Sequence, residues 1–385
     1  MTVASADAIL CSVFSLGGEG PRVAVKDSID IAGWPTRAGS AALADAPPAA
    51  VHADVVAHLL AAGGHIIGKA TMHELAFGVT GVNAYAGTAL NPLFPDRVPG
   101  GSSSGSAAAV AAGLADFGIG TDTGGSVRVP ACCCGVFGLK PTFGRVSRVG
   151  VMPAQTTLDC VGPFARNMAM LIRAMEMIDP GFTPVALGRV PVLGRMDVSA
   201  SPEVLEAVTH ALAYAAPQVR DVTVADLDAA YAAGLAVINA ETWAAVGALT
   251  DTGKVGADIA GRLIAASRTT PQDVADAEAV RVRVSAAIDA ALEGLDALVL
   301  PTMPDVPPKL ADAADSRAAI GITALVRAFN LTGHPALSVP LRTASGLPAG
   351  LQLVGRKGAD AQLCAVAAWI EARLPQARRI WPEAA

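Results

Sequence analysis

The chain has 385 residues, a net charge of −6 and only 16% charged residues. This length fits one large α/β domain or two to three smaller ones. The low charge and the mean hydropathy of +0.46 exclude a disordered chain, and the acidic balance provides no basic surface for nucleic acid. Gly, Asp or Glu interrupts each apolar run before it reaches the roughly 20 residues of a membrane span. We therefore expect neither a membrane protein nor a nucleic-acid binder.

Six cysteines are few for this length, and Cys132, Cys133 and Cys134 are consecutive. Adjacent cysteines cannot pair without severe strain, and no C-x-x-C spacing appears. We expect reduced thiols, a cytoplasmic protein and neither a metal site nor another cofactor, and we interpret the three consecutive cysteines as packing residues. No basic residue precedes the short apolar stretch 9–16, so an export signal is not expected.

Predicted helices and short strands alternate along most of the chain. The first half shows helices over 54–62 and 104–115, each followed by a buried strand, over 65–68 and 117–120. From about 202 to 294 the pattern is almost wholly helical. Strands at 297–301, 336–340 and 350–354 and a helix at 360–374 follow. This alternation predicts an α/β fold with a mixed, twisted sheet covered by helices on both faces, and with a helical insertion.

Two well-known motifs are present only in part. The segment 63–69 fits G-x-x-x-x-G-K, but Ala70 stands where a P-loop needs a Ser or Thr to bind Mg²⁺. His73 and Glu74 begin an H-E-x-x-H motif, but Phe77 replaces the second histidine. Neither a P-loop nucleotide site nor a zinc protease of that type is expected.

The segment Gly101–Gly105 matches G-x-S-x-G, the nucleophile elbow of α/β-hydrolases, with Ser103 as the nucleophile. Only His210 and His334 lie downstream of it. His210 belongs to a helical, solvated stretch and His334 to a Gly-His-Pro turn, and a structural role is favoured for both. An α/β-hydrolase-type esterase is the main rival interpretation.

Two other segments favour a different nucleophile. Ser126 follows two glycines in a loop that leaves a strand, so the successive amides of Thr123, Gly124, Gly125 and Ser126 would face one point, as an oxyanion hole requires. Lys26 lies on an apolar strand, where burial would keep its amine neutral and able to act as a base. From the residues alone, the simpler explanations are favoured: ordinary turn chemistry for the serine loops, and a strand-end lysine with a solvated amine for Lys26.

Together these segments resemble the amidase signature family. The resemblance covers about residues 22–370 and rests on Val25–Asp27, Gly100–Ser106, Gly120–Pro130, Gly138–Thr142, Leu300–Thr302, Gly333–Ala336 and Gly350–Leu353. Asn83–Gly87 and Pro95–Pro99 look most similar to the indole-3-acetamide hydrolase type of plant amidase and its bacterial relatives. The resemblance implies a single amidase domain over 1–385, with a signature core at about 22–170, a helical insertion at about 200–294, and C-terminal strands and a helix at 295–375.

The resemblance also implies a Ser-Ser-Lys triad that hydrolyses the C–N bond of a small carboxamide through an acyl-enzyme. Ser126 would be the nucleophile, Ser102, after a cis peptide bond, the bridging serine, and Lys26 the terminal base. Ammonia or an amine would be released. The residues expected to supply supporting hydrogen bonds are Ser103, Asp122 and Arg128.

The resemblance leaves other functions open: the A subunit of a glutamine-hydrolysing amidotransferase, and a catalytically silent binding protein. The helical region that usually precedes the lysine is missing, so we expect a monomer or a homodimer. The scarcity of charged and aromatic residues favours an apolar acyl pocket and a largely uncharged primary amide as substrate. Arg128, two residues after Ser126, is the group that would instead bind an anionic amide.

Overall fold

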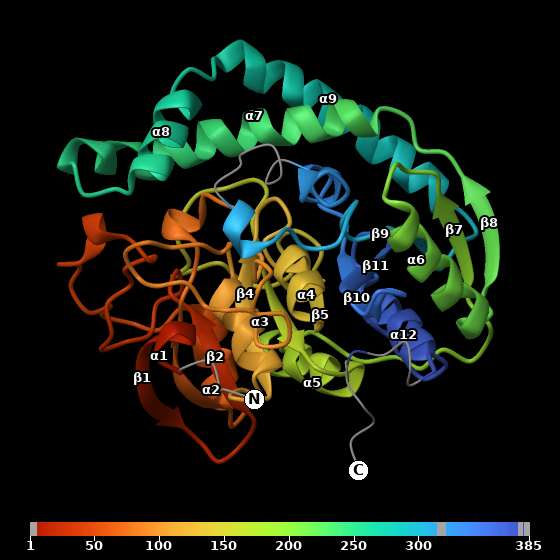
Figure 1. The fold of residues 1–385 in the computed structure, drawn as a ribbon, viewed down its shortest axis with the longest axis horizontal. Coiled ribbons are helices and arrows are strands. Elements are labelled where there is room, and N and C mark those ends of the chain that lie inside the picture. Colours follow the sequence, from red (N-terminus) through yellow and green to blue (C-terminus); the bar gives the residue numbers. More distant parts are fainter. Residues whose placement is uncertain (1–5, 314–320, 376–379, 381–385) are drawn as a thin grey trace.

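Eleven strands pair into one continuous sheet in a computed structural model that describes residues 6–313, 321–375 and 380 (Figure 1). The strands are β1 (Leu10–Gly17), β2 (Arg22–Lys26), β3 (His65–Ala70), β4 (Phe117–Asp122), β5 (Phe137–Lys140), β6 (Cys160–Ala165), β7 (Val192–Met196), β8 (Gln218–Val222), β9 (Ala297–Pro301), β10 (Ala336–Arg342) and β11 (Pro348–Val354). Their order across the sheet is β1-β3-β2-β4-β6-β5-β10-β11-β9-β7-β8. Strand β2 is parallel to β3 and β4, and β7 is parallel to β8 and β9, whereas the other neighbouring pairs are antiparallel. The sheet is therefore mixed, as predicted.

Helices cover both faces of this sheet. They are α1 (Ala6–Ile9), α2 (Asp54–Ala61), α3 (Ser104–Ala111), α4 (Arg128–Cys134), α5 (Met168–Ile178), α6 (Pro202–Ala215), α7 (Leu227–Val246), α8 (Ala257–Ala266), α9 (Pro271–Ala291), α11 (Arg327–Leu331) and α12 (Asp360–Glu371). Every residue of β4, β6, β9 and β11 is buried, although side chains alternate between the two faces along a strand. Both faces are thus covered where these strands lie, which confirms the predicted α/β fold.

One part of the segment predicted as almost wholly helical is a strand. Strand β8 lies at the edge of the sheet, where β7 is its only neighbour among the described strands. Four of its five residues are exposed, and its sequence Gln-Val-Arg-Asp-Val is polar enough to face solvent. It lacks the apolar run by which β9, β10 and β11 were predicted, so the sequence pattern did not separate it from the helices around it.

Helices α7, α8 and α9 form an arc along one side of the molecule (Figure 1). Helix α9 begins with a capping box between Thr270 and Asp273, and α7 packs against α8, α9 and α11. By length and composition alone the 26-residue segment Leu227–Thr252, which contains α7, could cross a membrane. This is weak support for a span, because the core helices of other proteins pass the same test.

Strands β2 and β4 place the residues expected to carry chemistry. They are parallel, with Val25 opposite Ile119, so their carboxyl ends reach the same edge of the sheet. Lys26 is the last residue of β2 and Asp122 the last of β4. Ligands of open α/β sheets bind beyond the carboxyl ends of the strands, so this edge is where a site is expected.

Candidate active site

Small side chains allow α3 to lie directly against β4. A Cβ added to Gly120 would lie 2.6 Å from Ser103 Oγ, so no larger residue fits there. Ser103 is fully buried; its hydroxyl donates to Thr121 O at 3.1 Å and accepts from Thr121 N at 3.2 Å. These bonds fix the Gly-Ser-Ser-Ser-Gly segment to the strand, and a buried hydroxyl bonded in this way is unavailable as the nucleophile of an α/β-hydrolase.

Lys26 and Ser102 are brought together from opposite sides of this packed region. Both are fully buried, and Lys26 Nζ lies 2.8 Å from Ser102 Oγ and 2.7 Å from Thr121 Oγ1. The peptide bond between Gly101 and Ser102 is cis, as predicted. The carbonyl of Ser102 accepts a hydrogen bond from His73 N at 3.0 Å, which fixes the backbone beside the lysine.

Burial lowers the pKa of Lys26 to about 8, although Asp159 and Asp122 act in the opposite direction. Both hydrogen-bond partners of the amine are hydroxyl groups, and neither stabilises the charged form as a carboxylate would. The amine can therefore lose its proton near neutral pH and accept one from Ser102, which is what a general base must do.

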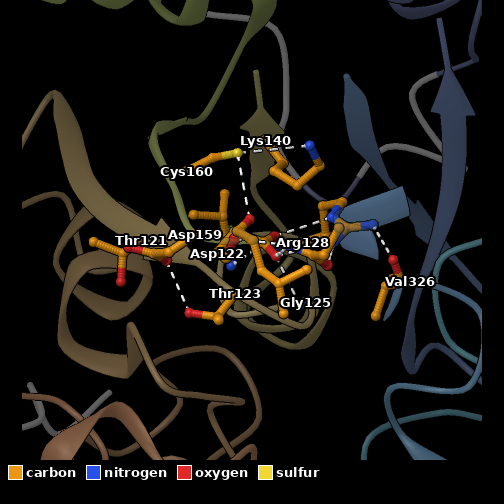
Figure 2. Close-up of polar contacts among 12 residues, drawn as sticks. Thr121, Asp122, Thr123, Gly125, Arg128, Lys140, Asp159, Cys160 and Val326 are labelled. Atoms are coloured by element: carbon orange, nitrogen blue, oxygen red, sulfur yellow. Dashed lines mark hydrogen bonds and ion pairs between the residues drawn. The ribbon is translucent and has the colours of Figure 1, made fainter. Parts of the chain in front are cut away.

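Two other buried lysines in the described part of the chain have different partners. Lys69 Nζ lies 3.1 Å from Asp27 Oδ1 and forms a buried ion pair with it. Lys140 Nζ donates to a backbone carbonyl and lies 3.8 Å from Cys160 Sγ (Figure 2). Of these three buried lysines, Lys26 alone contacts a serine hydroxyl.

The Asp122 carboxylate shapes the loop between β4 and α4. It accepts hydrogen bonds from the amides of Gly125 at 2.7 Å, Val127 at 3.1 Å and Arg128 at 3.3 Å. Gly125 has a φ of 117°, which favours glycine, and an added Cβ would lie 2.5 Å from Val326 Cγ2. We predicted that the Gly125 amide would belong to the oxyanion hole. It does not, because it already donates its hydrogen bond to the Asp122 carboxylate.

The other three amides predicted for the oxyanion hole are those of Thr123, Gly124 and Ser126. None has a hydrogen-bond acceptor among the residues described, and Ser126 Oγ has no partner there either. Ser126 is 7% exposed, whereas Lys26 and Ser102 are fully buried. Thr123 and Gly124 are only partly buried, so these amides can donate to an oxygen atom from outside the chain.

The segment before Ser102 packs against α4, the helix that follows Ser126. A Cβ added to Gly100 would lie 2.7 Å from the Cα of Pro130. Thr121, which shares the Lys26 amine with Ser102, leads directly into the Ser126 loop. No hydrogen bond joins the two serines within the described residues, and in general such catalytic contacts tighten when substrate binds.

Arg128 is fully occupied by contacts inside the protein (Figure 2). It is fully buried, and its nitrogens donate to Asp122 at 2.9 and 3.0 Å and to Val326 O, Gln352 Oε1 and Asn330 Oδ1 at 2.6–2.8 Å. Burial alone would raise the pKa of the Asp122 carboxyl, but Arg128 and Asn330 hold it well below its usual range. Arg128 is therefore not free to bind an anionic substrate.

We expect Asp122→Asn to destabilise the protein strongly. The substitution leaves Arg128 buried without its counter-charge, and breaking such a pair costs about 3–5 kcal/mol. Urea unfolding followed by circular dichroism measures this change. Asp221→Asn is the matched control, because its ion pair with Arg195 is exposed on both sides, and we expect no measurable change there. Equal urea concentrations at the midpoint of unfolding for Asp122→Asn and the wild type would contradict this account of the loop.

A pocket opens next to the Ser126 loop, with about 530 Å³ of empty space, part of which is open to solvent. Its lining is mostly apolar and comes from the N-terminal loops, the loop after Gly150 and helix α7: Ser28, Ala38, Met72, Leu75, Ala76, Phe77, Thr123, Met152, Pro153, Thr156, Ile238, Glu241, Thr242, Ala245 and Val246. Thr123 connects this pocket to the Ser126 loop. Glu241 adds a carboxylate, which accepts hydrogen bonds from Thr156 and from Thr157 at 2.7–2.8 Å. The sequence pattern did not indicate this wall, because α7 lies far from the signature segments.

The three consecutive cysteines lie in α4, the helix that follows the Ser126 loop. All three are buried and unpaired. Burial raises the pKa of Cys132 to about 12, and Cys134 Sγ contacts Pro99 O at 3.3 Å. Thiols held in the protonated form without solvent access are unreactive, which agrees with a packing role.

Comparisons with known proteins agree with this geometry. The family model described as Amidase matches residues 20–182 and 192–364. The A subunit of glutamyl-tRNA(Gln) amidotransferase from Halobacterium salinarum is 34% identical over 403 residues, which cover 92% of this chain and 95% of that protein. Amidase 1 from Oryza sativa subsp. japonica is 33% identical over 379 residues, covering 88% and 86%. A crystal structure of an amidase has a TM-score of 0.85 and 34% identity, covering 92% and 85%. The chain therefore belongs to the amidase signature family and is an amide-hydrolysing enzyme, as the resemblance implied.

Proposed function

We propose that this enzyme cleaves the C–N bond of small carboxamides through an acyl-enzyme on Ser126, with Ser102 as the bridging serine and Lys26 as the base. The observation that carries the proposal is the buried contact of 2.8 Å between Lys26 Nζ and Ser102 Oγ, beside a loop with three unpaired amides. Release of ammonia from a series of primary carboxamides tests it.

In the first half of the reaction Ser126 Oγ attacks the carbonyl carbon and loses its proton to Ser102, which passes its own proton to neutral Lys26. The amides of Thr123, Gly124 and Ser126 are the candidates for donors to the developing oxyanion, and each such donor is worth about 3 kcal/mol. The proton returns through Ser102 to the leaving nitrogen, so the C–N bond breaks to a neutral amine or ammonia. Water then attacks the acyl-enzyme and releases the acid.

The pocket beside Thr123 is a suitable place for an apolar acyl group. Apolar side chains line most of it, and burying an apolar group against them is favourable by about 25 cal/mol per Å². Glu241 is a hydrogen-bond acceptor on the same wall. Short aliphatic and aryl acyl groups are therefore the substrates to test first.

We expect Ala245→Phe to narrow this pocket. Ala245 lines it from the exposed side of α7, so the larger side chain does not disturb the core. The ratio of kcat/KM for phenylacetamide to kcat/KM for acetamide should fall roughly tenfold or more, because overpacking a site costs about 1–3 kcal/mol. Ala244→Phe is the matched control, since Ala244 is exposed on the same helix and does not line the pocket. An unchanged ratio in Ala245→Phe would place the acyl group elsewhere.

The amidotransferase relatives favour one alternative, in which this chain hydrolyses glutamine for a partner subunit. Hydrolysis of glutamine in preference to other carboxamides, together with co-purification of a second subunit, would support it. We otherwise propose a cytoplasmic monomer or homodimer that acts on a small-molecule amide. All six cysteines are free, which is typical of a reducing compartment.

A further inference from the structure

A second arginine, Arg327, lies beside the nucleophile loop with two nitrogens unpaired. The side chain is on α11 and only 8% of the residue is exposed. Its Nη2 donates to Thr323 Oγ1 at 2.9 Å, whereas Nε and Nη1 are buried and have no hydrogen-bond partner in the described part of the chain. No carboxylate of those residues forms an ion pair with it. Arg128, in contrast, uses all of its donors.

The position of Arg327 is fixed by packing on two sides. A Cβ added to Gly124 would lie 3.6 Å from Arg327 Nε, and one added to Gly234 of α7 would lie 2.9 Å from Arg327 Cγ. The guanidinium carbon lies 4.0 Å from the centre of the Tyr231 ring. The guanidinium thus lies between α7 and the loop that carries Ser126. On that loop it is next to Gly124, two residues before Ser126.

The apolar pocket reaches the same residue of the loop. The Cβ position of Gly124 is 3.0 Å from Ile238 Cδ1, and Ile238 lines the pocket. A bound amide whose carbonyl is at Ser126 therefore has apolar side chains within reach on one side and a guanidinium on the other. The neighbouring Val326 contacts Gly125 and accepts from Arg128, so α11 cannot shift without moving the nucleophile loop.

A buried cation without a counter-charge is costly, and among the described residues only the Thr323 hydroxyl and Tyr231, through its phenol and its ring face, compensate for it. Burial lowers the pKa of Arg327 from its ordinary value, with Tyr231 opposing the shift, but a guanidinium keeps its charge in proteins. Even with these contacts, Nε and Nη1 have no acceptor among the described residues. The chemistry that would satisfy both the charge and the donors is a carboxylate.

We propose that Arg327 binds a carboxylate of the amide substrate, so that the enzyme prefers anionic amides over neutral amides of equal size. This inference rests on the proposed function at Ser126, and it replaces the expectation of an uncharged substrate. The carboxylate has two possible sources, the acyl group of the amide or its leaving group. Arg327 is a specificity residue in either case, since the bonds made and broken at Ser126 are the same.

Two pairs of substrates test the proposal and separate the sources. Glutaramic acid is compared with 5-methylhexanamide for the acyl side, and N-butyrylglycine with N-butylbutanamide for the leaving group. In the wild type we expect kcat/KM for the anionic member of one pair to be roughly 10- to 100-fold higher. Arg327→Gln should remove that preference, and Arg327→Lys should keep part of it. The control Arg268→Gln, at an exposed position, should keep all of it.

A second measurement does not depend on turnover. Glutarate should slow labelling of Ser126 by an uncharged fluorophosphonate in the wild type and not in Arg327→Gln. Hydrolysis of the neutral amides without any preference for an anionic one would overturn the role of Arg327 and leave the proposed function intact. A preference that persists in Arg327→Gln, or an equal loss on both members of a pair, would also overturn it. Absence of both hydrolysis and labelling would contradict the proposed function itself.

Discussion

Ser126→Ala should lower kcat for amide hydrolysis by roughly 10⁴-fold or more and abolish labelling by a fluorophosphonate. The nucleophile is the one member of a triad that the other members cannot replace, and its removal costs about as much as removing the whole unit. The fold should persist, because Ser126 Oγ has no hydrogen-bond partner within the described residues and the substitution therefore breaks no such bond. Steady-state kinetics with ammonia detection and intact-mass analysis of the labelled protein measure the two effects.

The site of labelling separates this mechanism from its main rival. In the wild type, peptide mapping should place the phosphonyl adduct on Ser126. An adduct on Ser103 would instead support an α/β-hydrolase mechanism. We do not expect it, because Ser103 Oγ is engaged in two hydrogen bonds with Thr121. Ser267→Ala is the matched control, because Ser267 is exposed and bonds only to the last turn of its own helix. It should be labelled and turn over as the wild type does.

The parts of the fold that sequence predicted best are those that local patterns specify. Helix α2, which ends two residues before Gly63, and the strand after it follow from the glycine pair and the apolar run. The small-residue helix after Ser103 follows from its composition. Strand β8 was missed because an exposed edge strand does not need an apolar pattern. Pairing partners across the sheet depend on contacts between segments far apart, which no local window contains.

The same distinction applies to the site. Lys26, Ser102 and Ser126 were named because they lie in segments with a recognisable order of residues, whereas Arg327 and Glu241 lie on α11 and α7 without any such signal. The role of Gly125 was misjudged for a related reason. The Gly-Gly-Ser sequence indicates a turn with several amides, but only the position of the Asp122 carboxylate decides which amide is already occupied.

Lys26→Met should reduce kcat/KM for amides by roughly 10²- to 10⁴-fold, the range that general acid–base catalysis contributes. Methionine fills a similar volume but cannot accept a proton from Ser102. The loss should be smaller for an activated ester of the same acid, because its leaving group departs without protonation. Lys26→Arg should not restore amide hydrolysis, since a guanidinium stays charged and cannot act as a base. Equal losses on matched amide and ester substrates would mean that Lys26 only positions Ser102.

The pH dependence of the wild type gives an independent test of the same residue. Because burial lowers the pKa of Lys26 to about 8, the neutral, active form grows as pH rises through that value. The kcat/KM for a neutral amide should therefore increase roughly tenfold between pH 7 and pH 9 and level off above it. The rise should be absent in Lys26→Met, which has no group to titrate there. A wild-type profile that falls over this range would require the charged lysine, and it would exclude Lys26 as the base.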